Sequence, residues 1–195
     1  MYFGMFGSIF LLTQYLQTVH GYSPLEAGLA TLPWTAMPMF VAPIAGAFSD
    51  RIGGRPLMAT GMALQAGGLA WMAAISSVDT PYLEMVVPFM MAGVGMALYF
   101  APSAHVVLGS VARADEGKAS GAANAVRELG GVFGVAVLGS VFSSQGGYGA
   151  PQTFVDGLVP AVAIGAAVVA LGAALALLIP SRRTAPAVQA KPAAA

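Results

Sequence analysis

The sequence predicts an all-α protein that crosses a lipid bilayer several times. Of its 195 residues, 57% are hydrophobic and only 8% are charged, whereas charged residues make up about a quarter of an ordinary soluble domain. The mean hydropathy is +0.78. The apolar residues gather in six segments, each near the roughly 20 residues that a helix needs to cross the hydrocarbon core. We therefore expect a polytopic membrane protein with six transmembrane helices.

The six expected helices are separated by short polar or glycine-rich connections. They run over residues 1–19, 25–48, 56–77, 82–108, 117–143 and 157–179. Together they form one expected domain, residues 1–180. The last stretch, residues 181–195, is rich in Ala and Pro and has no apolar period, so we expect a disordered cytoplasmic tail.

Two helix starts and the first residue can be interpreted from local sequence. Ser23, Pro24 and Glu26 match a helix N-terminus with a capping box. Asp156 is expected to open the last helix, where its charge complements the helix dipole. The first helix begins at Met1 without a polar or basic flank. We expect from this that the chain starts inside a longer reading frame or is a truncated copy.

The basic residues set the expected orientation in the membrane. If the connection at residues 50–55 is cytoplasmic, strict alternation places every Lys and Arg inside or in the inner part of a helix, as the positive-inside rule requires. These residues are Arg51, Arg55, Arg113, Lys118, Arg127, Arg182, Arg183 and Lys191. The expected location is the plasma membrane, with a cytoplasmic C-terminus.

Composition and motifs argue against an enzyme. The formal net charge is zero, so nothing indicates a nucleic-acid partner. Gly117 and Lys118 resemble the end of a phosphate-binding loop, but Ala119 stands where that motif needs Ser or Thr. His20 and His105 have no Cys or acidic partner at metal-ligand spacing. We expect no enzymatic activity, no metal and no cofactor.

Prolines interrupt the second segment. Pro33, Pro38 and Pro43 each remove a backbone hydrogen bond and kink a helix. In a membrane, such breaks persist only where neighbouring helices or a water-filled cavity satisfy the freed carbonyls. Two interpretations stay open: a bent helix that lines a cavity and rocks, and a static kink in a packed bundle.

Glycines recur in the fifth segment at a spacing of four. The two pairs are Gly117 with Gly121 and Gly130 with Gly134. Small residues at this spacing lie on one side of a helix and allow a neighbouring helix to approach closely. We expect a face for helix packing here.

Polar side chains inside the apolar segments are the candidate functional residues. Placing such groups in a bilayer costs free energy, and those that occur there usually mark a substrate or ion pathway. Gln14 and Gln17 in the first segment and Gln65 in the third are expected to line a substrate cavity. Arg127 is a further cavity candidate. It either extends to the interface or pairs across helices, or it contacts substrate.

Two ionisable residues are candidates for proton coupling. Glu128 follows Arg127 directly, so the two side chains point to different helix faces and pair poorly. A proton-coupling role is one hypothesis for Glu128. His105, late in the fourth segment, is either an inner-leaflet packing residue or a proton relay.

Four stretches carry a resemblance to a known family. Residues 46–55, GAFSDRIGGR, resemble the cytoplasmic loop motif of the major facilitator superfamily, G-x-L-a-D-r-x-G-r-[KR]. Residues 11–33, the GxGxxxxxxP pattern of residues 93–102, and residues 118–140 are similar to its fourteen-helix drug:proton antiporter branch. The resemblance covers nearly the whole chain apart from the tail. It implies that the six helices form the C-terminal half of a major facilitator bundle.

The resemblance also implies roles and partners. Gly46, Asp50, Arg51, Gly53 and Arg55 would form a conformational gate that contacts the opposite half, with the substrate between the halves near the midplane. The implied function is efflux of a small hydrophobic or cationic drug-like substrate by proton antiport in a bacterial plasma membrane. The implied partners are protons, the lipid bilayer, and a missing N-terminal half or partner subunit.

Proton coupling stays open for this chain, because the best-known proton-carrying carboxylates of the family lie in the first half. Two alternatives to the half-transporter also remain. The chain could be a genuine half-size membrane subunit that pairs with itself or with a partner. It could instead be a non-transporting membrane module or a gene fragment with no activity alone.

Overall fold

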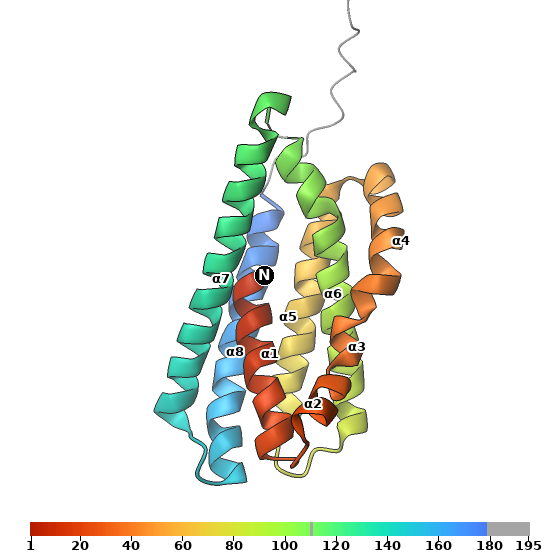
Figure 1. Cartoon of the computed structure of the whole chain (residues 1–195). Helices are drawn as coiled ribbons and strands as arrows, with labels where there is room; N and C mark the ends of the chain where they lie inside the picture. Colours follow the sequence, from red (N-terminus) through yellow and green to blue (C-terminus); the bar gives the residue numbers. More distant parts are fainter. Residues whose placement is uncertain (110, 179–195) are drawn as a thin grey trace, which may run out of the picture.

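The computed structural model describes residues 1–109 and 111–178, without the side chains of Asp50 and His105, and every regular element in these ranges is helical. The elements are α1 (Tyr2–Thr18), α2 (Pro24–Ala30), α3 (Leu32–Thr35), α4 (Met37–Ile52), α5 (Gly54–Ile75), α6 (Tyr82–Leu108), the 3-10 turn η1 (Arg113–Asp115), α7 (Glu116–Gln145) and α8 (Pro151–Ala176). They form an elongated bundle (Figure 1). The predicted all-α fold is confirmed.

Four of the described helices, α5 to α8, are long and apolar enough to cross a membrane. The bent pair formed by α2 and the helical stretch after it makes a fifth span if its two parts are counted as one. The remaining helix, α1, has 17 residues and is therefore about 25 Å long, somewhat less than a hydrocarbon core of about 30 Å. Its N-terminus lies at mid-height beside α7 (Figure 1).

The second predicted segment is broken rather than continuous. Its two parts, residues 24–30 and 32–49, meet at 43°. Pro33 and Pro38 stand in the first turns of α3 and α4, where a missing N–H breaks no helical hydrogen bond. Pro43 lies inside α4. The predicted interruption is therefore present as a 43° bend just before Pro33, and Pro38 begins a new helix.

The capping box predicted before α2 is confirmed. The Ser23 side chain accepts a hydrogen bond from the backbone N–H of Glu26, and the Glu26 carboxylate accepts one from the backbone N–H of Ser23 at 2.8 Å. Two N–H groups that a helix start leaves unpaired are thereby satisfied. This fixes the point where the chain turns from α1 into the bent span.

The connection between α4 and α5 is shorter than the polar turn expected at residues 50–55. α4 continues to Ile52 and α5 begins at Gly54, so only Gly53 separates the two helices. Gly53 has φ +90°, a region that side-chain-bearing residues avoid and glycine adopts freely. Gly54 lies close to α6, since a Cβ there would sit 2.9 Å from Val106.

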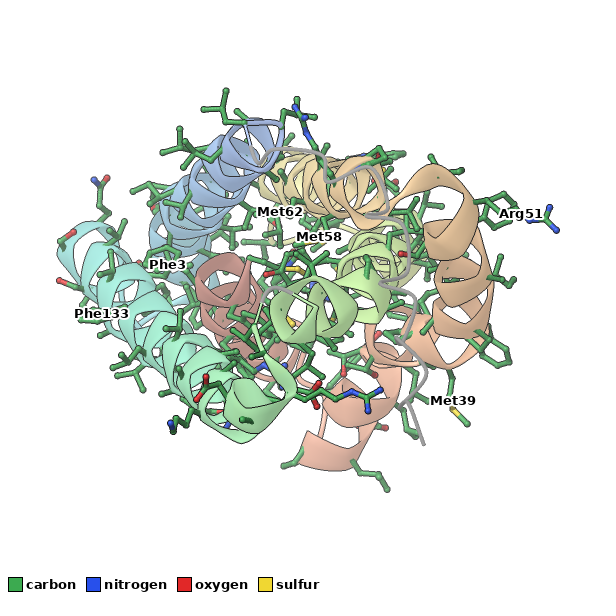
Figure 2. All side chains as sticks on the ribbon, turned by 90° about the horizontal axis from the view of Figure 1, so that it is seen from above. Phe3, Met39, Arg51, Met58, Met62 and Phe133 are labelled. Atoms are coloured by element: carbon green, nitrogen blue, oxygen red, sulfur yellow. The ribbon has the colours of Figure 1, made fainter. Side chains whose placement is uncertain are left out.

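The core lies around α5, which packs between α6 and α8 (Figures 1 and 2). The backbones of α5 and α6 nearly touch: a Cβ on Gly61 would lie 2.6 Å from the carbonyl oxygen of Gly95. The apolar side chains of α1, α5, α6 and α8 fill the interior. By contrast, α4 packs chiefly on α6 and turns its outer face away, with Met39 80% exposed (Figure 2).

The last helix begins earlier than predicted. α8 starts at Pro151, so Asp156 lies inside the helix instead of opening it, and it accepts a hydrogen bond from Gln152 at 2.9 Å. Pro151 occupies the first turn, where its ring favours a helix start. The proposed tail, residues 181–195, lies outside the described residues.

Candidate functional site: a groove between α1 and α7

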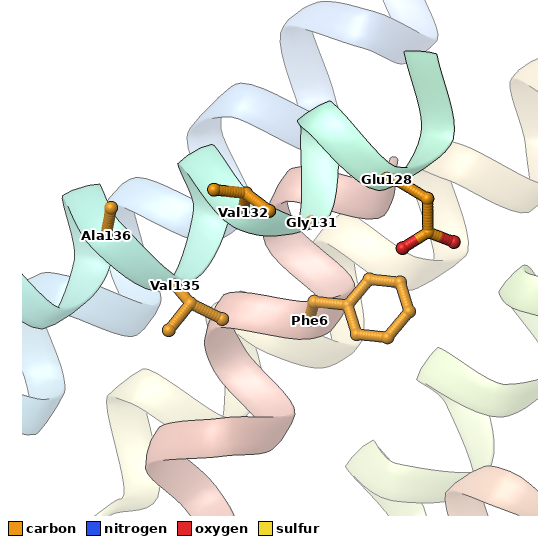
Figure 3. Close-up of a pocket in the computed structure, with 6 residues that line it drawn as sticks. All are labelled: Phe6, Glu128, Gly131, Val132, Val135 and Ala136. Carbon is orange, nitrogen blue, oxygen red and sulfur yellow. The ribbon is translucent and has the colours of Figure 1, made fainter. Parts of the chain in front are cut away.

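Two adjoining hollows lie between α1 and α7 and share Phe6 and Val135. The inner hollow, by which we mean the one nearer the N-terminus of α1, has a volume of about 510 Å³ and is also lined by Glu128, Gly131, Val132 and Ala136 (Figure 3). The outer hollow, nearer the C-terminal end of α1, has a volume of about 550 Å³ and is also lined by Ile9, Phe10, Thr13, Gln14 and Gln17. Because they share two residues, we treat them as one trough, the α1–α7 groove.

Glycines of α7 create the close approach that forms the floor of the groove. A Cβ on Gly134 would lie 2.1 Å from the backbone oxygen of Phe3, and one on Gly131 would lie 2.9 Å from the Phe6 ring. Gly117 and Gly121 face open space, with nothing within 4 Å. Of the two predicted pairs, Gly130 and Gly134 therefore do form a packing face against α1, with a Cβ on Gly130 lying 3.3 Å from Tyr2, whereas Gly117 and Gly121 pack on no described element.

The α1 wall of the groove is one face of a helix. Phe6, Phe10, Thr13, Gln14 and Gln17 follow one another at steps of three or four residues or stand side by side, so they line the same side. The Gln14 side chain donates to the backbone oxygen of Phe10 at 3.4 Å, and that of Gln17 donates to Thr13 at 3.3 Å. The two amides are thus held along the helix at the outer end.

Tyr148, in the connection between α7 and α8, ties this outer end to the rest of the bundle. Its hydroxyl donates a hydrogen bond to the Gln14 side-chain oxygen. Its ring packs against Phe142 and Phe154, with centroids 5.2 and 5.6 Å away. The orientation of the Gln14 amide is therefore set from both of its ends.

His20, in the connection that follows α1, has its ring 4.8 Å from that of Tyr15. Burial lowers the pKa of this histidine below its ordinary value of 6.5. At neutral pH the side chain is therefore uncharged. The residues that line the outer hollow are likewise all without charge.

Glu128 is the acidic residue of the groove, and its neighbour Arg127 is turned elsewhere. The Arg127 guanidinium lies 5.1 Å from the centre of the Tyr2 ring, which itself stacks on Phe100 at 5.5 Å. Among the described residues the one salt bridge joins Lys118 to Asp115 at 2.8 Å. Glu128 therefore has no ion-pair partner in the described part of the chain.

The residues predicted to bind substrate or to couple protons lie in different parts of the structure. Gln14, Gln17 and Glu128 come together in the groove. Gln65 is 0% exposed in the core, where its backbone contacts Gly95 and neither side-chain polar atom has a hydrogen-bond partner. Arg127 and Gln65 are not among the groove's lining residues. The side chain of His105 lies outside the described part of the structure.

The residues predicted as a conformational gate lie on a different side of the bundle. Arg51 points outward, on the side opposite Phe133 of α7 (Figure 2). Arg55 is half-buried, and Gly46 has open space around it. Gly53 forms the break between α4 and α5, and the side chain of Asp50 is not described. The gate and the groove are thus separate regions.

Sequence reasoning missed the apolar and aromatic members of the site. Phe6 and Phe10 are ordinary membrane-helix residues taken singly, and their spacing from Gln14 and Gln17 was the available signal. Tyr148 lies in a connection 134 residues further along the chain from Gln14, and no local pattern connects the two. Only the packing of α1 against α7 and α8 brings them together.

A bundle of membrane-spanning helices with a groove on one side is compatible with a membrane transporter. The family comparison identifies which kind. The chain matches the Major Facilitator Superfamily over residues 1–194. It belongs to that superfamily and is a transporter-family protein, not an enzyme.

Several relatives are named for drug resistance or export. The chain is 35% identical to the multidrug resistance protein Stp of Mycobacterium tuberculosis over 74% of this chain and 26% of Stp. It is 33% identical to the tetracenomycin C resistance and export protein of Streptomyces glaucescens, over 83% of this chain and 30% of that protein. It is 32% identical to the multidrug efflux pump LfrA of Mycolicibacterium smegmatis, over 72% of this chain and 28% of LfrA.

The chain thus aligns with between 26% and 30% of the length of these relatives. The predicted superfamily membership is confirmed.

Proposed function

We propose that this chain is the C-terminal six-helix half of a multidrug efflux transporter of the fourteen-helix branch. It exports drug-like compounds by proton antiport across a bacterial plasma membrane, with its C-terminus in the cytoplasm. The observation that carries the proposal is the α1–α7 groove, a mostly apolar trough with the carboxylate of Glu128 in its wall and no ion-pair partner for it among the described residues. Relatives named for multidrug resistance and export support it.

The groove and the exposed side of α7 suit a partner half, because a transport pathway in this superfamily lies between two halves near the midplane. In this proposal Gln14 and Gln17 line the substrate pathway, and Glu128 takes part in proton or cation binding. Gln65 and Arg127 serve the packing of the bundle, because they lie in the core and on Tyr2. A proton-relay role for His105 stays a prediction.

The gate belongs to the same proposal. Gly46, Asp50, Arg51, Gly53 and Arg55 act where α4 meets α5. The single-residue break at Gly53, with its positive φ, supports this role, since it joins α4, which packs chiefly on α6, to α5. We propose that this end of the bundle contacts a missing N-terminal half or a partner subunit and stabilises one state of alternating access.

A chimera tests the proposed function. The matching segment of LfrA is replaced by this chain, and efflux of a fluorescent cationic dye is followed in inverted vesicles with an imposed pH gradient. We expect the chimera to move dye only while the gradient is present, and the chain alone to move none. Dye movement by the chain alone would instead support a half-size subunit that pairs with itself. A correctly inserted chimera without efflux would contradict the proposed function.

A further inference from the structure

We propose that the α1–α7 groove binds an elongated ligand with two different polar ends. One end carries a cationic group that meets Glu128, the body is apolar, and the other end carries an uncharged hydrogen-bonding group that meets Gln14 and Gln17. This inference rests on the proposed function, because it specifies the substrate class of the same groove. It adds to that class the distance between the two polar groups of the ligand and the difference in their chemistry.

The inner end favours a cation because the carboxylate there has no ion-pair partner among the described residues. Glu128 is exposed at the side of a hollow otherwise lined by Phe6, Gly131, Val132, Val135 and Ala136 (Figure 3), and it stands on a helix long and apolar enough to cross a membrane. A carboxylate that faces the apolar part of a bilayer is unfavourable unless an opposite charge or a proton meets it. The neighbouring Arg127 does not neutralise it, because its guanidinium lies over Tyr2. A cationic group on a ligand fills that role.

The Phe6 ring strengthens the preference for a cation. It lies in the same hollow as Glu128, and 38% of the residue is exposed. A cation placed over the face of an aromatic ring gains about 0.5–2 kcal/mol, more when water is excluded. Carboxylate and ring together therefore select a cationic group over a neutral one of the same size.

The outer end offers hydrogen bonds without charge. The Gln14 oxygen accepts from Tyr148, and its nitrogen donates to Phe10, which leaves one N–H available. The Gln17 nitrogen donates to Thr13, which leaves one N–H and the side-chain oxygen available. Uncharged donors and an acceptor close together match an amide, a carbamate or a hydroxyl group. They offer a second cation no opposite charge.

The two ends are separated by a fixed length of helix. Phe6, beside Glu128, precedes Gln14 by two turns and Gln17 by three, so at a rise of about 1.5 Å per residue the ends lie roughly 12–16 Å apart. Each hollow is within the range of about 300–1,000 Å³ usual for ligand sites. A compact lipophilic cation reaches one end only, whereas an elongated one reaches both.

A matched set of probes tests this proposal on the full chain in lipid nanodiscs by calorimetry. The first probe is an alkyl chain with a trimethylammonium group and a primary amide about 14 Å apart, the separation that the helix rise predicts. The second lacks the amide, and the third is a short homologue that keeps both groups. We expect the first probe to bind at least about tenfold more tightly than either of the others.

Two variants test which residues of the groove bind each end of the probe. Glu128→Gln is expected to weaken the first probe about tenfold or more, whereas Glu84→Gln, an exposed carboxylate in the first turn of α6, leaves it unchanged. Gln17→Leu is expected to remove the advantage of the amide, whereas Gln145→Leu, an exposed amide at the end of α7, preserves it. Circular dichroism of each variant checks the fold, and Gln17→Leu remains informative if Glu128→Gln misfolds.

Three results would overturn the inference. Equal affinity for the three probes removes the two-ended site. Binding that ignores Glu128→Gln points to a lipid chain or a protein helix as the occupant of the groove. Absence of binding for all three probes excludes the site in this chain. None of these results decides whether the chimera transports dye, so the proposed function stands or falls on its own experiment.

Discussion

The two halves of α7 each contain a pair of glycines four residues apart, yet they have different surroundings. The C-terminal half places Gly131, Gly134 and Leu138 against α1, and all three are buried. The N-terminal half, residues 116–129, also contains small residues but is almost entirely exposed, and Gly117 and Gly121 touch nothing. α1 begins at the level where the two halves meet (Figure 1).

This difference shows that a glycine spacing marks the capacity for close packing and not the presence of a partner. The covered half contributes to the stability of this chain, because its side chains fill space against α1. The uncovered half contributes little of that kind. Substitutions in the two halves should therefore have different effects, and three pairs of variants measure the difference.

The largest difference is expected between two apolar truncations. Leu138 is 0% exposed, so Leu138→Ala leaves a cavity and lowers the free energy of unfolding by about 2–5 kcal/mol. Val126, 68% exposed, serves as the control, and Val126→Ala is expected to change stability by less than about 0.5 kcal/mol. Denaturant unfolding of the purified chain in detergent, followed by circular dichroism, measures both. Equal losses would mean that the N-terminal half is covered as well.

The second comparison adds one methyl group at each glycine. In Gly134→Ala the new Cβ meets backbone, which cannot move aside as a flexible side chain does, so we expect a loss of about 1–3 kcal/mol. In Gly121→Ala nothing lies within 4 Å, and removal of a helix glycine stabilises by up to about 1 kcal/mol. The sign of the change thus differs between the halves. A gain in melting temperature for Gly134→Ala would refute the close contact of α1 with α7.

The smallest effect is expected at the boundary between the halves. Arg127→Gln removes the contact with the Tyr2 ring and should lower stability by about 0.5–1 kcal/mol. Arg113→Gln, which changes an exposed arginine in η1, is the charge-matched control and should leave stability unchanged. The same unfolding assay, carried out at low and at high salt, measures the stability of both variants. If the control loses as much as Arg127→Gln, general charge and not the ring contact is responsible.

Much of the fold follows from local chemistry and was therefore predictable. Hydropathy located the helices, with α6 predicted at the bounds that the structure shows, and Ser23 with Glu26 marked a helix start correctly. The predicted helix boundaries were wrong where two weak local signals indicate different ends for the same helix. The charged residues 50 and 51 indicated a turn, but they continue α4, because the glycine after Ile52 is what ends the helix.

The site was predictable only in its polar members. Gln14, Gln17 and Glu128 are unusual in apolar segments and could be singled out one by one. Their assembly depends on which helices are neighbours, and α1 packs on the two helices furthest from it in the chain. Arg127 and Gln65 are equally unusual, yet one lies on an aromatic ring and the other in the core. A sequence does not reveal where around the helix its partners stand.

The hydrogen bond between Tyr148 and Gln14 has a consequence for synthesis of the protein in the membrane. Its two residues are 134 positions apart, and ribosomes add about 5–20 residues per second. α1 therefore waits roughly 7–27 s before Tyr148 exists, and longer before α8 is complete. During that time its glutamines and the surface that will face α7 and α8 are in contact with lipid or with the insertion machinery. Among the described helices, α1 comes first in the sequence, yet it is among the last to be fully packed.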